Sequence, residues 1–440
     1  MPAPRLTGRV VLPSDTAYDT DRFDFNKRFD LFPQIIVYCQ NALDVGNGVR
    51  WARSRNLPIT VRSGGHSYEA FSLGPGLVID LSDLNRIAVD RSRGTVVAQP
   101  GIRLLDFYRA LSVHGVTVPG GTCAGVGLSG LTLGGGVGFL TRKWGLASDN
   151  LRSLELVDAS GRRITASDSH NPDLFWACRG GGGSFGIATA LIFETHPIGE
   201  VAVFDCEWPF DRAGAVLAFW QQQAPFWPDE LTASLEINGT GPGTVTSEGL
   251  WLGRETELRA LLQPLLAAAP TDRVNIITTS YIDATEKFSG QSTMPYFKAK
   301  SDYARAPLGP EAIEIIRHFM AASPTPHATI QFQAYGGAVN RIPATATAFP
   351  HRDSLFSIQY IIHWSDPIDG PPSFTWIRDF HAAMRPYVSG HAYSNMCDLD
   401  LDDWPHAYYS VNLQRLVEVK TRYDPDNVFH FAQSIPRLLP

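Results

Sequence analysis

The sequence predicts an α+β protein with two domains, and three observations support this fold class. The chain has 440 residues, which is more than one ordinary hydrophobic core accommodates. Residues 30 to about 199 alternate short β-rich runs with helix-like segments. From about residue 200 the amphipathic stretches become longer, with β-rich runs between them. We therefore expect one α+β domain up to residue 199 and a second one beyond it.

The first domain contains short strands and two clear helices. Strands are expected at 35–38, 58–61, 77–81 and 95–98, at the hairpin 154–157 and 163–166, and at 187–195. The first helix is expected to begin at Asp44 and to end at Arg55. The second is expected over 104–111, where Leu104, Tyr108 and Leu111 recur at helical spacing.

The second domain mixes longer helices with strands. The expected helices are 211–225, 254–267, 309–321 and 373–386, and the expected strands include 329–334 and 355–363. The last fifty residues are rich in aromatic residues and Asp, and they include the segment 423–429. No internal repeat and no low-complexity segment is present in the sequence.

Charge and composition exclude several classes of function. The net charge of −7 and the pI of about 5.9 argue against nucleic-acid binding, which needs basic clusters. No run of 18 apolar residues predicts a membrane span. Residues 1–15 lack the apolar core of a secretory signal, so we expect a cytoplasmic protein, or a secreted one if a signal was removed. The five cysteines are scattered and show neither zinc spacing nor a disulfide framework.

Two Gly-rich loops carry the most informative residues. The loop 61–68 contains His66, and the loop 119–130 contains Cys123. Glycine lets a backbone approach a ligand closely and adopt positive φ. A lone histidine or cysteine is more often a structural core residue. One nucleophilic side chain in each such loop instead suggests a large, flat cofactor held from two sides.

The segment Gly125–Gly130 also matches the dinucleotide fingerprint G-x-G-x-x-G. That interpretation requires a strand before it, a helix after it and an acidic residue about 20 positions later, near Asp149. However, residues 131–138 are too rich in Gly to begin a helix comfortably, because each internal Gly costs roughly 1 kcal/mol against Ala. The Rossmann interpretation is therefore disfavoured, and the absence of G-x-x-x-x-G-K-[ST] from the sequence excludes a P-loop.

Several motifs in order resemble the berberine bridge enzyme-like branch of the FAD-linked oxidases. They are R-S-G-G-H-S-Y, G-G-T-C-x-x-V-G, L-G-G-G-V-G, G-L-A-S-D-N-L, D-L-F-W-A-C-R-G-G-G-G-S-F-G-I and Y-D-P-D-N-V-F-x-F-A-Q-S-I. The match covers roughly residues 30–199 and 390–436, whereas the middle matches loosely, best at 297–302.

This resemblance implies a specific architecture within the vanillyl-alcohol oxidase superfamily. Residues 1–199, chiefly 30–199, would form a PCMH-type FAD-binding domain of two subdomains. Residues 200–389 would form the substrate domain, with an antiparallel sheet covered by helices. Residues 390–440 would return to the FAD domain.

The same resemblance implies bicovalent FAD and no metal. His66 would bond the 8α-methyl carbon of the flavin and Cys123 its C6 atom, because imidazole and thiolate are good nucleophiles. The further cofactor-binding residues implied are Arg62, Ser63, Gly64, Gly65, Ser67, Val126, Gly127, Gly130, Gly134, Gly135, Gly186, Ile187 and Asn412, with Gln433 nearby. In the family, valine at the position of Val126 is associated with oxidases, which implies O2 as acceptor and H2O2 as product.

The segment 404–412 resembles the family motif W-x-x-x-Y-Y-G-x-N, in which a tyrosine takes the substrate's hydroxyl proton. Spacing favours Tyr408, with Tyr409 as the alternative. The sequence departs from the family at Ser410, where Gly is usual, and at Met396, where Tyr is common.

Three functions follow as hypotheses. The first is an oxidase of an alcohol or of a sugar hydroxyl. The second is an oxidative tailoring enzyme of a secondary metabolite, acting by dehydrogenation or ring closure. The third is a flavin-free binding protein of the same fold. The expected partners are a small-molecule substrate (sugar, alcohol or natural product) and O2, without nucleic acid or membrane, for a monomer or homodimer.

Overall fold

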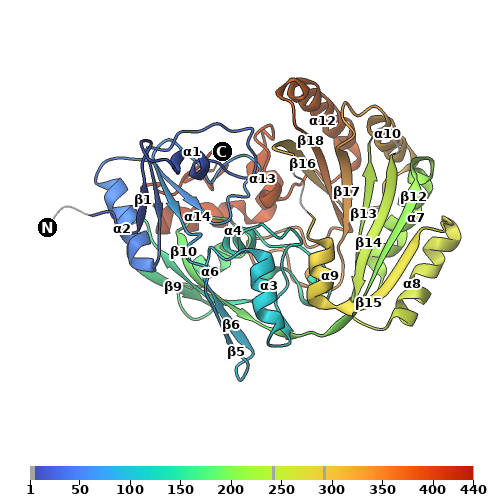
Figure 1. The fold of residues 1–440 in the computed structure, drawn as a ribbon, viewed down its shortest axis with the longest axis horizontal. Coiled ribbons are helices and arrows are strands. Elements are labelled where there is room, and N and C mark those ends of the chain that lie inside the picture. The colour runs from blue at the N-terminus through green and yellow to red at the C-terminus, as the bar shows by residue number, and fades with distance from the viewer. Residues whose placement is uncertain (1–4, 240–242, 291–293, 440) are drawn as a thin grey trace.

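A computed structural model describes residues 5–239, 243–290 and 294–439. Figure 1 shows a first half on the left, which contains both chain ends, and a second half on the right. The right half is built around one large sheet, and the left half around smaller ones. This arrangement confirms the α+β fold class expected from the sequence.

The first half contains two sheets. Sheet A has the order β1 (Arg9–Val11), β2 (Ile35–Tyr38), β4 (Leu77–Asp80), β3 (Ile59–Arg62), and its β2, β4 and β3 run parallel. Sheet B is antiparallel, with the order β5 (Ile87–Asp90), β6 (Thr95–Ala98), β10 (Ile187–Glu194), β8 (Leu151–Val157), β9 (Arg163–Ser167). A small ladder joins β7 (Val116–Thr117) to β11 (His196–Pro197).

Helices pack these sheets into two cores. The α-helices of the first half are α1 (Tyr18–Asp21), α2 (Ala42–Arg53), α3 (Leu104–Ser112), α4 (Leu128–Leu133), α5 (Thr141–Trp144) and α6 (Pro172–Ala177). Val45 and Val49 of α2 pack on Ile79 of sheet A, and all three side chains are fully buried. Leu104 and Phe107 of α3 belong to a separate core beside sheet B. The two sheets therefore bury apolar side chains independently.

Two helices differ from the sequence prediction in physically informative ways. Helix α2 begins at Ala42, before Asp44, because the Asn41 side chain caps it by accepting from the amides of Leu43 and Asp44. A short helix, α4, does form within the Gly-rich region. It ends at Leu133, where the run of glycines begins.

The second half is built on sheet C. Its antiparallel order is β15 (Val274–Ser280), β12 (Glu200–Pro209), β14 (Thr244–Trp251), β13 (Leu231–Asn238), β17 (Ala328–Ala334), β18 (Phe356–Trp364), β16 (Tyr296–Ala304). The helices α7 (Ala213–Gln223), α8 (Glu255–Ala268), α10 (Pro310–Ala321) and α12 (Gly370–Met384) cover its outer face (Figure 1). Leu235, Phe332 and Ile358 point into the core between sheet and helices. The inner face is left to the cavity described below.

Of the remaining helices, two contact α3 and α5 of the first half and two belong to the C-terminal segment. They are α9 (Tyr281–Phe288), α11 (Ala338–Arg341), α13 (Trp404–Tyr409) and α14 (Leu413–Tyr423). Leu413 and Leu416 of α14 share a buried cluster with Phe175 of α6, so the C-terminal segment packs on the first half. Strand β12, the first strand of sheet C along the chain, begins at Glu200. Among the described residues, every helix is too short or too polar to cross a bilayer.

Candidate active site

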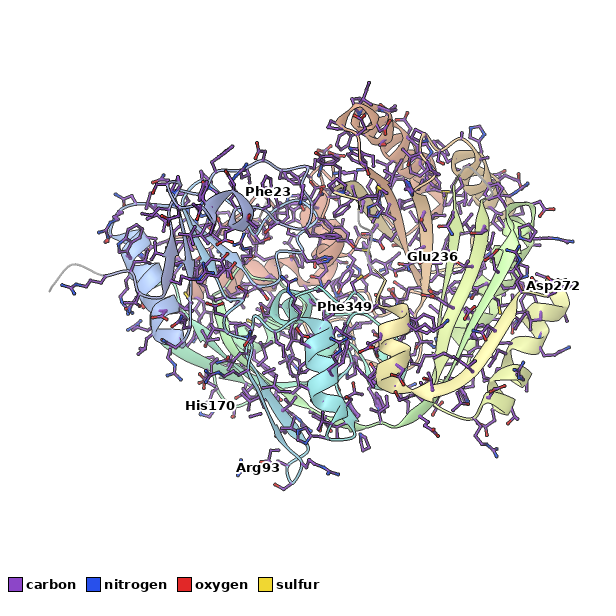
Figure 2. All side chains as sticks on the ribbon, in the orientation of Figure 1. Phe23, Arg93, His170, Glu236, Asp272 and Phe349 are labelled. Atoms are coloured by element: carbon purple, nitrogen blue, oxygen red, sulfur yellow. The ribbon has the colours of Figure 1, made fainter. Side chains whose placement is uncertain are left out.

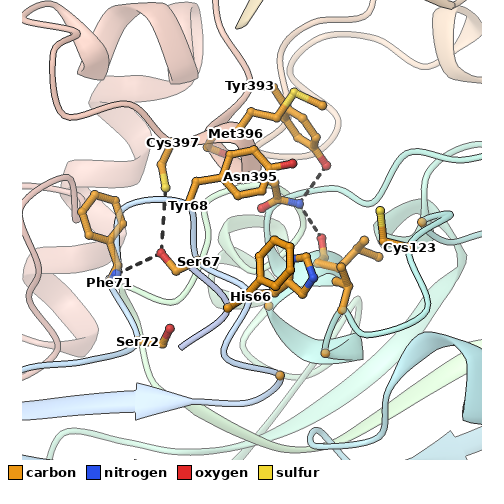
Figure 3. Close-up of a pocket in the computed structure, with 18 of the residues that line it drawn as sticks. His66, Ser67, Tyr68, Phe71, Ser72, Cys123, Tyr393, Asn395, Met396 and Cys397 are labelled. Carbon is orange, nitrogen blue, oxygen red and sulfur yellow. Dashed lines mark hydrogen bonds between the residues drawn. The ribbon is translucent and has the colours of Figure 1, made fainter. Parts of the chain in front are cut away.

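The candidate site is a cavity of about 800 Å³ between the first half and sheet C. Its wall combines the loops of His66 and Cys123 with inner-face side chains of sheet C. The C-terminal segments 393–397 and 408–409 close a third side. Figure 3 shows His66 and Cys123 directed toward the same space from different loops. This volume lies within the roughly 300–1,000 Å³ usual for small-molecule sites.

His66 follows β3, and its ring is held by stacking. The Phe25 ring lies 4.0 Å away, centroid to centroid, at an interplanar angle of 15°. The Nε2 atom of His66 is buried without a hydrogen-bond partner among the described residues. Burial, together with the positive charge of Arg103, lowers the pKa of His66 to about 4. The imidazole is therefore uncharged at neutral pH and able to act as a nucleophile.

Cys123 lies in a loop that is anchored at the beginning of α3. The Leu104 amide donates to the Val126 carbonyl (3.0 Å) and the Leu105 amide to the Ala124 carbonyl (3.3 Å). The first amides of a helix have no partner inside it, so the loop satisfies them. The Cys123 side chain reaches the cavity. Burial raises the pKa of its thiol, so the thiol is protonated at neutral pH.

Gly64 and Gly127 bring the two loops into backbone contact. A Cβ atom on Gly64 would lie 2.3 Å from the nitrogen of Gly127, and one on Gly127 would lie 2.4 Å from the nitrogen of Gly64. Gly65 additionally has a φ of +63°. Any larger residue at 64 or 127 would force the loops apart. These glycines therefore set the spacing between His66 and Cys123.

The structure brings most of the predicted cofactor-binding residues to this cavity. Besides His66 and Cys123, the wall includes Ser63, Gly64, Gly65, Ser67, Val126, Gly127, Gly130, Gly186 and Ile187. The Ser67 hydroxyl accepts from the Phe71 amide (2.9 Å) and lies 3.9 Å from Cys397 Sγ (Figure 3). These predicted residues come from three separate segments, 63–67, 123–130 and 186–187, so the cavity depends on the tertiary fold.

Four predicted residues lie behind the wall instead: Arg62, Gly134, Gly135 and Asn412. The Arg62 guanidinium is committed to a buried ion pair with Asp80 at the end of sheet A. The Asn412 Nδ2 donates to the carbonyls of Ala344 (2.8 Å) and Thr347 (3.1 Å). Its side chain therefore supports the 344–348 loop and does not line this cavity.

The two glycines behind the wall have a packing role. A Cβ atom on Gly134 would lie 1.9 Å from Oδ1 of Asn395. Gly135 has a φ of +129° and lies against Phe349 and Tyr393. Both positions admit the C-terminal segment next to the Cys123 loop, and neither faces the cavity.

Tyr408 and Tyr409 end α13, and both line the cavity. The Tyr408 hydroxyl donates to Gln433 Oε1 (3.2 Å) and accepts from the Asp398 amide (3.0 Å). The Tyr409 hydroxyl has no hydrogen bond within the part of the chain that the structure describes. Burial raises the pKa of both phenols. Only Tyr408 has a donor that stabilises its ionised form, which favours it as the proton acceptor.

Sheet C presents a polar row to the cavity. Glu236, Gln331 and Gln359 are cross-strand neighbours on β13, β17 and β18, and all three line the cavity. Gln331 Nε2 donates to Glu236 (2.6 Å), and Gln359 Nε2 donates to the Tyr68 hydroxyl (3.0 Å). Figure 2 labels Glu236 on sheet C, in the right half of the molecule. We call these three residues the polar row; they offer several donors and acceptors to a ligand's hydroxyl groups.

The cavity wall is acidic. Its carboxylates are Glu236 and Glu248, and no lysine or arginine of the described residues lines it. Burial, assisted by the charge of Glu236, raises the pKa of Glu248 to about 7. Burial also raises the pKa of Glu236, against the hydrogen bond from Gln331. A substrate that carried phosphate or carboxylate beside these two glutamates would find no lysine or arginine on the described sheet C wall to compensate its desolvation.

Sequence reasoning missed the polar row, although part of the signal was present. Polar and apolar residues alternate in 328–334 and in much of 231–238, which is typical of a strand with one face in a core. The sequence contains no information on which strands pair. Only the pairing order places Glu236, Gln331 and Gln359 side by side.

These features fit the flavin that the sequence resemblance implies. The unpartnered His66 nitrogen is suited to a bond with an electrophilic carbon atom, and the Cys123 sulfur is suited to one once its thiol has lost its proton. The glycine backbone around them leaves room for a flat ring to approach closely. His66, Cys123 and the glycine loops would hold the group, and sheet C would face it across the cavity.

Comparison with known proteins gives two family matches. A family model described as “FAD binding domain” matches residues 33–167. A second, described as “Berberine and berberine like”, matches residues 392–436. These two stretches contain His66, Cys123 and both candidate tyrosines.

Similar proteins match over nearly the whole chain. FAD-linked oxidoreductase YgaK of Bacillus subtilis (strain 168) is 40% identical, over 99% of this chain and 98% of its own length. Monolignol oxidoreductase AtBBE-like 13 of Arabidopsis thaliana is 31% identical, over 97% of this chain and 85% of its own.

Solved structures match equally broadly. BBE-like 1 of Physcomitrella patens superposes with a TM-score of 0.92 at 33% identity, covering 99% of this chain and 98% of its own. Phl p 4, a grass pollen allergen with glucose dehydrogenase activity, gives 0.89 at 29%, covering 98% and 97%. A chitooligosaccharide oxidase gives 0.88 at 27%, covering 97% of both chains.

Proposed function

Because this chain belongs to the berberine bridge enzyme-like family of FAD-linked oxidoreductases, we propose that it oxidises a hydroxyl group of an uncharged, hydroxyl-rich small molecule such as a sugar. We propose His66 and Cys123 as the two covalent attachment points of FAD. O2 is the proposed final acceptor, with H2O2 as product. When bound, FAD supplies the acceptor for the hydride that leaves the carbinol carbon.

The polar row is the observation that carries this substrate class. A sugar presents hydroxyl groups at several positions, and Glu236, Gln331 and Gln359 offer matching donors and acceptors along one wall. The sheet C side of the wall has Glu236 and Glu248 and no lysine or arginine among its described residues, which favours an uncharged substrate over a phosphorylated or carboxylated one. The glucose dehydrogenase and chitooligosaccharide oxidase activities of two structural neighbours support a sugar.

Tyr408 is the proposed acceptor of the substrate's hydroxyl proton. A phenol accepts a proton only after it has lost its own, so this role requires groups that stabilise the phenolate. The amide of Asp398 is such a group, since it donates to the Tyr408 oxygen at 3.0 Å. Gln433 fixes the orientation of the phenol from the other side.

The attachment of FAD can be tested without knowing the substrate. We expect the wild-type protein to keep its yellow colour after acid precipitation, and mass spectrometry to find FAD on the peptides of His66 and Cys123. His66→Ala and Cys123→Ala should each retain one bond, and the double variant should release FAD on denaturation. Cys397→Ala is the matched control, because this second thiol also lines the cavity. Covalent FAD in the double variant would refute the assignment.

The substrate class can be tested by measuring H2O2 release from a panel of compounds. The panel contains glucose, cello- and chitooligosaccharides, their phosphorylated or uronic counterparts, and aromatic alcohols. We expect neutral sugars to react fastest and each anionic counterpart to react more slowly than its neutral form. Faster oxidation of the aromatic alcohols would favour a tailoring enzyme instead.

Glu236→Gln provides the matching variant for the polar row. An amide retains the volume but removes two acceptor functions, so we expect KM for the best neutral sugar to rise by roughly tenfold, a loss of about 1.4 kcal/mol. The half-buried residue Glu255 provides the control Glu255→Gln, since it pairs with Arg259 away from the cavity. An unchanged KM in Glu236→Gln would remove the polar row from substrate binding.

A further inference from the structure

Lys298 and Lys300 belong to the motif at 297–302, and the site described so far gives them no role. Both lie on β16, at the edge of sheet C. Their side chains are 1% and 4% exposed. A lysine ammonium is seldom buried without paired charges, since desolvation of an ion is costly. Two of them on one short strand therefore indicate a specific arrangement.

The two ammonium groups meet on the carboxylate of Asp398. Lys298 Nζ lies 2.6 Å from one oxygen of Asp398, and Lys300 Nζ lies 2.6 Å from the other. Lys298 also donates to Glu69 (2.6 Å), and Lys300 to Asp400 (3.2 Å). Burial opposes the charge of Lys298, but Asp398 and Glu69 outweigh it and raise the pKa of this lysine. We call Lys298, Lys300, Glu69, Asp398 and Asp400 the lysine clamp.

The lysine clamp joins three distant segments of the chain. Glu69 lies three residues after His66, the lysines come from sheet C, and the aspartates belong to the C-terminal segment. The positive charges are those of the two lysines and of Arg28, which also pairs with Glu69. These three positive charges equal the three negative charges of Glu69, Asp398 and Asp400. The clamp therefore fixes the C-terminal segment against both walls of the cavity, and together with Arg28 it carries no net charge.

Asp398 connects the clamp to the proposed proton acceptor. Its main-chain amide donates to the Tyr408 hydroxyl oxygen (3.0 Å), and its carbonyl accepts from Gln433 Nε2 (2.7 Å). Tyr408 in turn donates to Gln433 (3.2 Å), which closes a ring of three residues. The side chain of Asp398 is thus held by the lysines, while its backbone holds Tyr408 and Gln433.

We propose that Lys298 and Lys300 are positioning residues, which hold the Asp398 amide against the Tyr408 oxygen and so set up Tyr408 for proton transfer. This inference rests on the proposed function of Tyr408. Fold stability alone does not account for the clamp, because well-packed apolar residues often stabilise a fold as well as a buried ion cluster does. Apolar residues would not fix the direction of the Asp398 amide, whereas two lysines on its two carboxylate oxygens do.

Lys300→Met is the primary test, because Lys298 still balances Asp398 in that variant. We expect its holoenzyme to retain covalent FAD and to reduce the flavin anaerobically about tenfold more slowly with the fastest sugar of the panel above, at saturating concentration. We expect no further slowing when Lys300→Met is added to Tyr408→Phe. Such non-additivity identifies residues that act through one another, whereas a general loss of packing would slow both backgrounds equally.

Three further measurements complete this test. Asp398→Asn keeps the volume and the backbone amide. If Lys300→Met does not fold, Asp398→Asn takes its place and is measured alone and together with Tyr408→Phe. Lys300→Arg should recover part of the rate. Lys143→Met, which breaks the surface pair with Glu230, should leave the rate unchanged. Equal slowing of the wild-type and Tyr408→Phe backgrounds, or an unchanged rate in Lys300→Met and Asp398→Asn, would overturn the proposal.

A crystal structure of Lys300→Met tests the geometry independently of any substrate. We expect the Asp398 amide to move out of hydrogen-bond distance of Tyr408. An unchanged 3.0 Å contact would overturn the clamp. If no sugar reduces the flavin, or if Tyr408→Phe has no effect, the proposed function fails instead, and the crystal structure alone decides whether the lysines hold the amide.

Discussion

His66 is stacked on Phe25 and carries an unpartnered Nε2 atom, a combination that suits a nitrogen that forms a covalent bond. Stacking fixes the plane of the ring without occupying its nitrogen. Burial keeps the ring uncharged, because the desolvated imidazolium is disfavoured. The folded protein therefore takes up its proton at a lower pH than an unfolded chain does. Between pH 6.5 and about 4 this lowers the stability of the flavin-free protein as the pH falls.

Formation of the His66 bond should depend little on pH. In Cys123→Ala, where only the histidine bond can form, we expect the rate of covalent FAD incorporation to stay within about twofold between about pH 5.5 and 8, because the imidazole is uncharged throughout. Incorporation is followed by in-gel flavin fluorescence after mixing flavin-free protein with FAD. An incorporation rate that falls on acidification with a midpoint near pH 6.5, the ordinary pKa of histidine, would contradict the lowered pKa.

Removal of the Tyr408 hydroxyl should slow the chemical step. We expect Tyr408→Phe to reduce the anaerobic rate of flavin reduction by roughly 10²–10⁴-fold, the usual contribution of a general base. Stopped-flow absorbance with the fastest sugar measures this rate. Tyr409→Phe is the control on the neighbouring position, and it should have a much smaller effect. The reverse order would assign the proton transfer to Tyr409.

At the scale of single elements, the end of α13 shows backbone strain directly beside the cavity-lining tyrosines. The helix ends at Tyr409, and Ser410 follows with a φ of +44°. L-residues other than Asn and Asp seldom adopt positive φ, and strained positions of this kind cost roughly 1–3 kcal/mol. The family usually has glycine here, so the departure seen in the sequence corresponds to a real conformational demand.

Ser410→Gly should therefore stabilise the protein. Relief of the positive φ exceeds the extra backbone entropy that glycine loses on folding, and we expect a net gain of about 1 kcal/mol. The shift in thermal midpoint of the holoenzyme measures this gain. Ser289→Gly serves as the control, because Ser289 also follows a helix but has a negative φ of −77°. Equal shifts in both variants would argue against strain at Ser410.

At the scale of the whole molecule, Arg142 ties the two halves together. It lies on α5 of the first half, and its Nε and Nη1 atoms donate to the carbonyls of Leu231 (2.8 Å) and Pro225 (2.9 Å) of the second half. The same guanidinium also donates to the carbonyls of Trp227 and Tyr335. Burial lowers the pKa of Arg142 to about 10, which still leaves it charged. One cation thus satisfies several buried carbonyl groups between the halves.

Arg142→Met should weaken this junction. It leaves buried carbonyl groups unsatisfied, and we expect a loss of roughly 3 kcal/mol or more in the free energy of unfolding. Thermal denaturation of the holoenzyme measures the loss. Arg254→Met is the control, because this exposed arginine has its one ion pair among the described residues with its helix neighbour Glu257. A change no larger than that of the control would show that the junction rests on apolar contacts.

Local features of the sequence determined the fold class, most helices and strands of the first half, and the two residues that face the cavity as candidate cofactor ligands. Hydrophobic periodicity acts over a few residues, and a nucleophile in a Gly-rich loop is visible within one motif. Helix starts were less certain, since the start of α2 depends on the Asn41 side chain.

Only the tertiary structure decided which side chains meet. It turned Asn412 away from the cavity, aligned Glu236 with Gln331 and Gln359, and joined Lys300 to Asp398. Each of these contacts links positions that are tens of residues or more apart in the chain. Their geometry depends on strand order and register, and a shift of one residue reverses the face to which a side chain points. The residue types were thus visible in the sequence, whereas their partners depend on long-range pairing.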